Sequence, residues 1–307
     1  FYNVRSMILP ELYLITQKVP KADIYHATAT GYSGILGSLG KWKYNKPFIL
    51  TEHGIYTRER EEELLRAQWV LPYFENQWIN LFHLFSDCAY SHADVVTALF
   101  RRANEAQMEL GCDENKLRET PNGVHIERFA DVSDKPEDGW TDIGAIVRIA
   151  RIKDIKTMIY AFAEVKREIG NVRLHIMGDI DDGEYYEACR TLIEQLGVQD
   201  IIFTGSVDVA EYIKKLDFII LTSISEGQPL SVLEAFAAGR ACVTTDVGCC
   251  RELIEGNDGL GEAGICVPPM NKEQVAQAML ELCREPLTRK RMGAVGRERV
   301  RKYYTHD

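Results

Sequence analysis

The sequence lacks the long apolar run that a membrane-spanning helix requires, because no stretch approaches roughly 18 consecutive apolar residues. It shows no signal peptide, and Phe1 is an unusual first residue, so we expect a missing N-terminus. Net positive charge is also absent: Lys and Arg number 36 against 46 Asp and Glu, for a formal charge of −10. This balance argues against broad nucleic-acid binding, but it leaves room for local basic patches that bind phosphate.

The eight cysteines form no C-x-x-C pair and no Cys/His cluster at metal-ligand spacing. Cys249 and Cys250 are adjacent, which is a poor geometry for a disulfide. We therefore expect reduced, mostly buried thiols in a cytoplasmic protein. No Asp-x-Asp motif supplies a metal site convincingly, since the segment from Asp179 to Asp182 reads more simply as a loop. We expect neither a metal nor a cofactor.

Short apolar segments alternate with helical ones along the 307 residues, which is typical of an α/β protein with parallel sheets. The length favours two domains. An acidic segment at 131–142, with little apolar content, reads as a linker between an N-terminal domain at 1–130 and a C-terminal domain at 143–307. We expect strands near 22–27, 47–51, 93–100 and 116–120, and then near 143–147, 172–177, 201–204, 217–221, 240–245 and 263–269. A long helix is expected at 59–85, broken or kinked at Pro72.

The segment from 217 to 245 reads as strand, loop, helix and strand. Pro229 suits the first helical position and Gly239 the position just past the helix. Glu226 lies in the loop and Glu234 on the helix, two turns in. Gly227 lets the backbone approach a ligand, and the free N–H groups of the helix start make an anion site at the strand's carboxyl end. From spacing alone, two surface glutamates around a helix start explain the segment equally well.

Two other loops at expected strand ends carry polar residues. Residues 148–153 hold three cations in six positions, which suits an anion, although a solvated basic loop is the simpler alternative. His53 follows a strand and precedes Gly54, at the end of the sheet where α/β proteins bind ligands. A lone histidine is more often structural, so these residues alone decide nothing.

The run Glu226-Gly227-x-Pro229-Leu230-x-x-Leu233-Glu234-Ala235 closely resembles the signature of the GT-B retaining glycosyltransferases of family four. Arg148 and Lys153 match the family's Arg and Lys five residues apart, although Val147 and Asp154 stand where the family usually has glycine. The segment Pro121–Phe129 is similar to the one that ends the family's first domain, with His125 in place of an aspartate.

This resemblance implies two Rossmann-like domains whose parallel sheets face a cleft. The first domain is expected to be incomplete, since its opening strand and Gly-rich turn are not visible. It further implies that Arg148 and Lys153 bind the donor diphosphate, Glu226 the donor sugar and Glu234 the ribose. The remaining donor-binding residues implied are Gly227, Gln228, Pro229 and Leu230 around the helix start, and Val207 near the base.

The run Thr51–Arg60 resembles a subgroup of the family that serves Pel-type exopolysaccharide synthesis. In the family the histidine that matches His53 touches the donor sugar and its phosphate. Arg58 is then a candidate for an acceptor or sugar contact. Alternatively, Arg58 and Arg60 pair with Glu59 and the glutamates at 61–63 on a solvated helix.

Together these residues predict a metal-independent retaining hexosyltransferase. It would move a hexose from a nucleotide sugar to a growing exopolysaccharide or glycan acceptor in bacterial biofilm synthesis. UDP is the preferred nucleotide, and ADP or GDP donors also occur in the family. The protein would be cytoplasmic or peripheral at the inner face of the cell membrane, with inner-membrane polysaccharide-synthesis proteins as partners. The alternatives are a non-catalytic nucleotide-sugar sensor or scaffold, and a GT-B phosphorylase, for which no lysine anchor for pyridoxal phosphate is evident.

Overall fold

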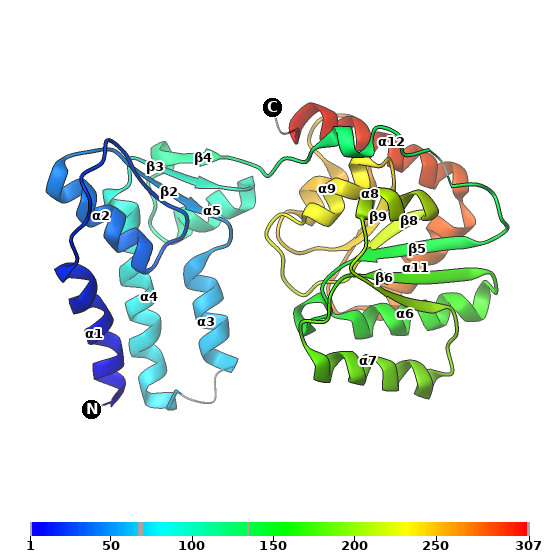
Figure 1. Ribbon diagram of the computed structural model, residues 1–307, viewed down its shortest axis with the longest axis horizontal. Coiled ribbons are helices and arrows are strands. Elements are labelled where there is room, and N and C mark those ends of the chain that lie inside the picture. Colours follow the sequence, from blue (N-terminus) through cyan, green and yellow to red (C-terminus); the bar gives the residue numbers. More distant parts are fainter. Residues whose placement is uncertain (1, 67–69, 134, 306–307) are drawn as a thin grey trace. The chain divides into compact units, whose positions relative to one another are not determined.

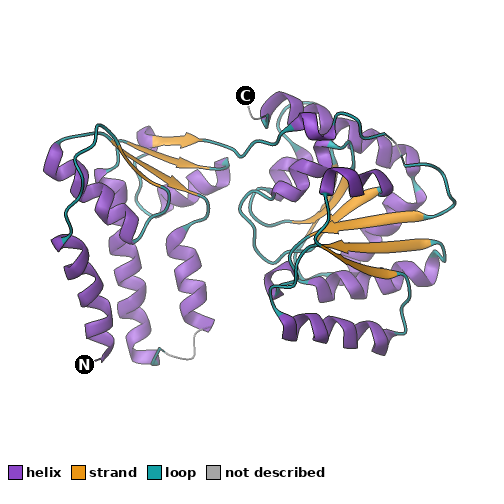
Figure 2. Cartoon of the chain, viewed as in Figure 1, coloured by secondary structure: helices purple, strands orange, loops and turns teal. Residues whose placement is uncertain are grey.

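The computed structural model describes residues 2–66, 70–133 and 135–305. The chain divides into two compact units, Phe1–Pro121 and Asn122–Asp307. Each unit consists of a parallel sheet flanked by helices (Figures 1 and 2). The alternation of strand and helix that the sequence predicts is therefore confirmed in both units.

The N-terminal unit has a four-stranded parallel sheet in the order β1-β2-β3-β4. Its helices α2 and α4 pack on the face where Phe48 and Leu50 of the second strand are buried. Its strands are β1 (Tyr25–Ala27), β2 (Phe48–Glu52), β3 (Val95–Ala98) and β4 (Leu117–Glu119), and its α-helices are α1 (Tyr2–Thr16), α2 (Tyr32–Tyr44), α3 (Tyr56–Arg66), α4 (Pro72–His92) and α5 (Arg101–Glu109).

The last residue of β2, Glu52, is 2% exposed and is held by neutral hydrogen-bond donors. The Thr30 hydroxyl donates to it at 2.6 Å, the Tyr90 hydroxyl at 2.7 Å and the Gln107 amide at 2.9 Å. Burial, and next the Glu52 charge, raise the pKa of Tyr90, so this tyrosine stays a donor. The network fixes the point at which the chain leaves the sheet and continues into His53.

The helix expected at 59–85 is two helices, α3 and α4. Residues 67–69 between them lie outside the described part of the chain. Pro72 stands in the first turn of α4, where its missing N–H leaves no helical hydrogen bond unmade and its fixed φ suits the helix. Of the two predicted effects, a break is observed rather than a kink, and the proline starts the second helix.

The C-terminal unit has a six-stranded parallel sheet in the order β10-β9-β8-β5-β6-β7. The order reverses between β5 and β8, and α/β sheets bind ligands at the carboxyl ends of the strands at such a point. Helices α6, α7 and α11 cover one face, and α9 and α12 the other (Figure 1). Its strands are β5 (Thr141–Ile146), β6 (Val172–Met177), β7 (Ile201–Gly205), β8 (Phe218–Leu221), β9 (Ala241–Thr245) and β10 (Gly264–Val267), and its α-helices are α6 (Ile155–Glu168), α7 (Gly183–Leu196), α8 (Val209–Tyr212), α9 (Leu230–Ala237), α10 (Cys250–Glu255), α11 (Lys272–Arg284) and α12 (Pro286–Tyr303).

The boundary between the units differs from the predicted one at residue 130. Val124 pairs with Thr305, and the short 3₁₀ helix η2 (Ile126–Phe129) packs on α9, so both belong to the C-terminal unit. The segment 131–142, predicted to be a linker, also belongs to it. Lys135 forms ion pairs with Asp138, Asp142 and Asp217, and residues 141 and 142 already lie in β5. Two of the acidic residues that suggested a linker, Asp138 and Asp142, pair instead with Lys135 and Arg173.

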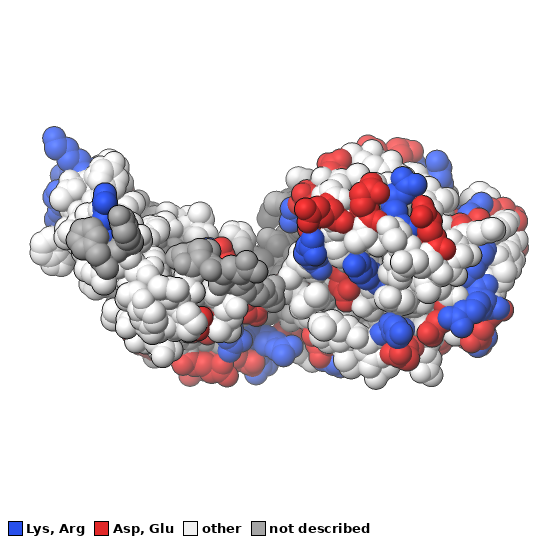
Figure 3. Space-filling model, turned by 90° about the horizontal axis from the view of Figure 1, so that it is seen from below, with Lys and Arg blue, Asp and Glu red and all other residues white. Residues whose placement is uncertain are grey.

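Charges of both signs are interspersed on the face of the C-terminal unit seen in Figure 3. This face is therefore not uniformly negative, although the net charge of the chain is negative. Local cationic sites remain compatible with an acidic protein.

Arg299 of α12 is 1% exposed and ties the helix to the loop that follows α10. Its guanidinium donates to the carbonyl oxygens of Leu253 at 2.7 Å and Ile254 at 2.9 Å, and it pairs with Asp258 at 2.7 Å. The hydrogen bonds from Arg299 lower the pKa of Asp258 to about 2. The buried cation is thus fully engaged.

We predict that Arg299→Met destabilises the protein by about 3–5 kcal/mol, because it leaves Asp258 and two carbonyl groups unpaired in the interior. Denaturant unfolding measures this. Arg301→Met, at an exposed position of the same helix, is the matched control and should change the unfolding free energy by less than about 0.5 kcal/mol. Equal effects of the two substitutions would contradict the role given to Arg299.

The same pair predicts acid sensitivity. Because the folded pKa of Asp258 lies below its usual 3.8, its stabilising contribution is complete above pH 4 and is lost as the pH falls through 2. Asp258→Asn should therefore flatten the stability profile between pH 4 and 2. An unchanged profile in that variant would show that other carboxylates cause the loss.

Candidate functional site

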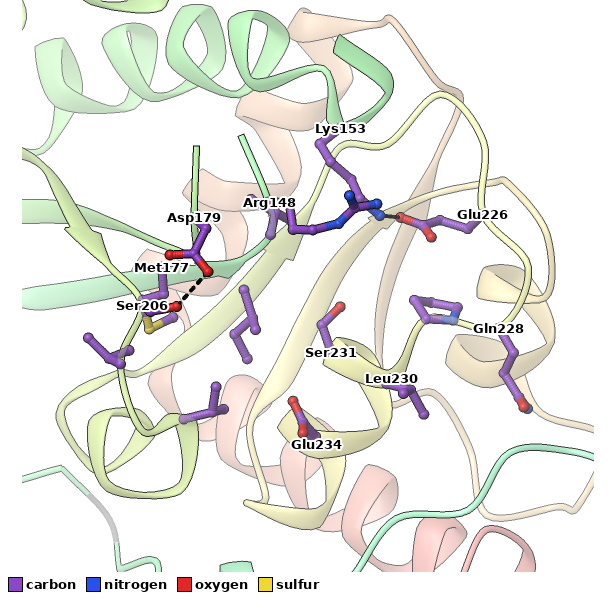
Figure 4. Close-up of a pocket in the computed structure, with 16 residues that line it drawn as sticks. Arg148, Lys153, Met177, Asp179, Ser206, Glu226, Gln228, Leu230, Ser231 and Glu234 are labelled. Carbon is purple, nitrogen blue, oxygen red and sulfur yellow. Dashed lines mark hydrogen bonds and ion pairs between the residues drawn. The ribbon is translucent and has the colours of Figure 1, made fainter. Parts of the chain in front are cut away.

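A cavity of about 540 Å³ opens in the C-terminal unit where the strand order reverses, within the range usual for small-molecule sites. Loops that follow four neighbouring strands line it (Figure 4). Arg148 and Lys153 follow β5, Gly178 and Asp179 follow β6, Ser206 and Val207 follow β7, and residues 226–234 follow β8. The strand register alone brings these loops to one edge of the sheet.

Two cations form one wall of the cavity. The Lys153 amine pairs with the Glu226 carboxylate at 2.5 Å, and the Ser223 hydroxyl donates to the same oxygen at 2.5 Å. Lys153 and Glu226 are both largely buried, so their mutual charge is poorly screened by solvent. Arg148 forms an ion pair with Asp181 while its guanidinium remains mostly exposed. The predicted proximity of Arg148, Lys153 and Glu226 is therefore observed.

The opposite wall is the start of α9. This helix begins at Leu230, with Pro229 as its N-cap, so the proline stands one position earlier than expected. The N–H groups of Leu230 and Ser231 lie in the first turn and have no acceptor within the helix. Glu234 is the fifth residue of α9, just beyond one turn rather than two turns in. Glu234 still lines the cavity (Figure 4), and Gln228, Pro229 and Leu230 line it as well.

Glu234 is half-buried, and none of the described residues donates a hydrogen bond to its carboxylate. Burial raises the pKa of Glu234, and the nearby positive charge of Arg128 opposes this shift. An acceptor left without donors in a cavity is suited to a ligand that supplies hydroxyl groups.

Gly227 lies between the lining residues Glu226 and Gln228. Its carbonyl oxygen accepts a hydrogen bond from the Cys249 N–H at 3.1 Å. Gly248 has φ +54°, and a Cβ there would stand 2.2 Å from the same oxygen. The loop after β8 is thus packed directly against the turn after β9.

The sequence analysis did not select Asp179, Ser206 or Ser231 as site residues, although all three line the cavity. The Ser206 hydroxyl donates to Asp179 at 2.9 Å across two loops. Applying the strand-end rule to β6 would have found Asp179, since it follows that strand after one glycine. Gly178 is required there because a Cβ would stand 2.1 Å from the Val147 carbonyl oxygen.

The segment from Asp179 to Asp182 is a loop, as expected. Asp181 pairs with Arg148, while Asp182 pairs with Arg151 at 2.8 Å and caps α7. Across residues 2–66, 70–133 and 135–305, no group of three His, Cys, Asp or Glu side chains is placed to hold a metal ion. Nor does any helix of that part combine the length and apolarity needed to cross a membrane.

His53 and Arg58 belong to the N-terminal unit. His53 is exposed and directly follows the buried Glu52. Arg58 pairs with Glu109 of α5 at 2.6 Å, whereas Arg60 pairs with Glu63 at 2.7 Å. The pairing of Arg60 with one of the glutamates at 61–63 is therefore observed, while Arg58 pairs with a glutamate of another helix. The roles of His53 and Arg58 toward a ligand stay predictions.

Comparison with protein families divides the chain in the same way as its structure. Residues 1–115 match a domain of unknown function (DUF3492), and residues 141–285 match the family described as glycosyl transferases group 1. The second match contains all four loops that line the cavity.

Two characterised relatives are similar to most of the chain. It is 24% identical to the MMP alpha-(1->4)-mannosyltransferase of Mycolicibacterium hassiacum over 91% of this chain and 66% of the relative. It is 29% identical to the alpha-monoglucosyldiacylglycerol synthase of Streptococcus pneumoniae over 86% of this chain and 64% of the relative. The chain thus spans just under two thirds of the length of each.

Among solved structures, Anabaena HepE in complex with UDP superposes with a TM-score of 0.77. The alignment covers 98% of this chain and 80% of HepE, at 16% identity. At this identity the similarity shows the fold alone, which is the GT-B class that the sequence predicts.

The raised pKa of Glu234 predicts a stabilising substitution. A carboxyl whose folded pKa lies above its usual 4.5 costs stability once it is charged, and this cost disappears below that pH. Glu234→Gln should therefore stabilise the protein at pH 7 by roughly 0.5–2 kcal/mol, and not at pH 4. Denaturant unfolding at both pH values measures this; a loss of stability at pH 7 would mean that the carboxylate is structurally satisfied.

Proposed function

We propose that the chain is a retaining glycosyltransferase, because residues 141–285 match the family described as glycosyl transferases group 1. It moves a hexose from a nucleotide sugar to a growing exopolysaccharide or another glycan acceptor. The single observation that carries this proposal is the cavity in which Arg148, Lys153, Glu226 and Glu234 meet at the point where the strand order reverses.

The donor is a nucleoside diphosphate sugar because the cavity offers the complementary groups in the right order. Arg148 and Lys153 bind the diphosphate as charge-assisted donors, supported by the free N–H groups at the start of α9. Glu234 accepts hydrogen bonds from the ribose hydroxyls, and Val207 lies beside the base. Glu226, anchored by Lys153 and Ser223, accepts from hydroxyls of the sugar.

Transfer breaks the bond between the anomeric carbon and the diphosphate oxygen, so negative charge grows on the diphosphate and positive charge on the sugar ring. Arg148, Lys153 and the helix start stabilise the first charge. Carboxylates stabilise the second, and Glu226 is the one on the sugar side. Since the protein itself supplies two cations, we propose that the reaction needs no divalent metal.

The acceptor side rests on the N-terminal unit. From the family resemblance, His53 contacts the donor sugar and its phosphate, and Arg58 contacts the acceptor or sugar. The acceptor attacks on the same face as the leaving diphosphate, which retains the anomeric configuration without a covalent enzyme intermediate. The resemblance of residues 51–60 to the Pel-type subgroup supports UDP as the nucleotide and an exopolysaccharide as the acceptor.

Calorimetric titration with UDP, ADP and GDP tests the donor site. UDP should bind the wild type most tightly. Lys153→Ala should weaken its binding roughly 10- to 150-fold, the equivalent of about 1.5–3 kcal/mol for a charged hydrogen bond. Lys156→Ala is the matched control, since this lysine stacks on Tyr185 and does not line the cavity. Equal loss in both variants, or no UDP binding at all, would refute the site.

Turnover tests the enzyme itself. Arg148→Ala should lower kcat for release of UDP from a UDP-hexose by on the order of 10²–10³, by analogy with the loss of one oxyanion donor. Arg190→Ala, an exposed arginine of α7, should leave kcat unchanged. NMR of the product should show the donor's anomeric configuration. An inverted product would refute retention, and tight UDP binding without turnover would instead favour a nucleotide-sugar sensor or scaffold.

A further inference from the structure

One residue that lines the cavity directs its polar group away from it. Gln228 follows the sugar-side loop and precedes Pro229, the N-cap of α9. Its side chain is only 7% exposed, and Figure 4 shows it directed away from Arg148 and Lys153. A buried amide requires hydrogen-bond partners, so the partner reveals its role.

The Gln228 side-chain oxygen accepts a hydrogen bond from the backbone N–H of Asn122 at 2.5 Å, across 106 residues of sequence. Asn122 is the first residue of the C-terminal unit, and Pro121 before it has no N–H to donate. The hydrogen bond therefore holds the first peptide N–H after the chain has passed from one unit to the other.

The segment that begins at Asn122 is fastened a second time shortly afterwards. The Val124 N–H donates to the Tyr304 carbonyl at 2.9 Å, and Val124 pairs with Thr305 just beyond α12. Residues 122–124 are thus anchored on one side to the end of the C-terminal helix and on the other to the loop of the cavity. The anchor at Gln228 uses the side chain of a residue that lines the cavity, whereas the anchor at Tyr304 uses a backbone carbonyl.

The two residues that precede Gln228 in the cavity loop are also held by hydrogen bonds. Glu226 is held by Lys153 and Ser223, and the Gly227 carbonyl is held by Cys249. Because the Glu226 side chain and the Gly227 carbonyl are already held, a ligand that orders this loop restricts mainly the side chain of Gln228. The Gln228 amide is then the direct path from the cavity to Asn122.

We propose that Gln228 is a positioning residue that couples occupancy of the donor cavity to the peptide joining the two units. A bound nucleotide restricts Gln228 and thereby strengthens its hydrogen bond to Asn122. This inference rests on the proposed function, since the occupant is the nucleoside diphosphate of the donor. It assigns Gln228 to the connection between the units rather than to recognition of the sugar.

Hydrogen–deuterium exchange of the intact chain, with and without saturating UDP, tests the coupling at the segment that contains Asn122. In the wild type, UDP should slow exchange there. Gln228→Met keeps the side-chain length but removes the acceptor. It should speed exchange without ligand by roughly 2- to 10-fold, the range for one net hydrogen bond. UDP should then bind without slowing exchange at Asn122.

Gln228→Glu keeps an acceptor oxygen and is the rescue variant: its exchange should slow with UDP as in the wild type. Ser231 lines the same cavity without touching Asn122, so exchange in Ser231→Ala should respond to UDP as it does in the wild type. If UDP binds by calorimetry but leaves exchange at Asn122 unchanged or faster, the coupling is refuted while the donor site stands. The coupling also fails if Gln228→Met responds to UDP as the wild type does. If UDP does not bind the wild type, the proposed function fails and the coupling with it.

Discussion

The pairing of β5 with β8 is the constraint on which the candidate site depends. The two strands lie side by side although 71 residues, 147–217, separate the end of β5 at Ile146 from the start of β8 at Phe218, and Ile143 pairs with Phe218. Parallel pairing sends both carboxyl ends to one edge, so the cationic loop after β5 must meet the acidic loop after β8. The ion pair between Lys153 and Glu226 is the direct result.

Charged side chains of both signs line the cavity. Its cations already have carboxylate partners, Glu226 for Lys153 and Asp181 for Arg148, which fix their side chains without filling the cavity. No described residue donates a hydrogen bond to the Glu234 carboxylate, and burial raises its pKa. We therefore expect this position, where donors from a ligand are needed, to cost stability, a common trade at functional sites. Gln228, in contrast, already accepts a hydrogen bond from Asn122, which suits it to connect the cavity with that peptide.

Sequence patterns predicted the features that depend on residues close together in the chain. The alternating apolar segments predicted the strands of both sheets. The rule that α/β sheets bind ligands at the carboxyl ends of their strands predicted Arg148 and Glu226 at one edge. The patterns did not decide how Pro72 acts, because a proline both ends and begins helices. The sequence patterns also did not predict contacts between segments that are far apart in the chain. The hydrogen bond from Asn122 to Gln228 depends on how η2 and α9 pack, and no spacing in the sequence encodes that packing.

A crystal structure of the chain with UDP is the decisive test of the donor site. We expect the diphosphate within hydrogen-bond distance of Arg148 and Lys153, with the ribose hydroxyls on the Glu234 carboxylate. Bound UDP at any other place, or in this cavity with its ribose remote from Glu234 and its phosphates remote from both cations, would contradict it.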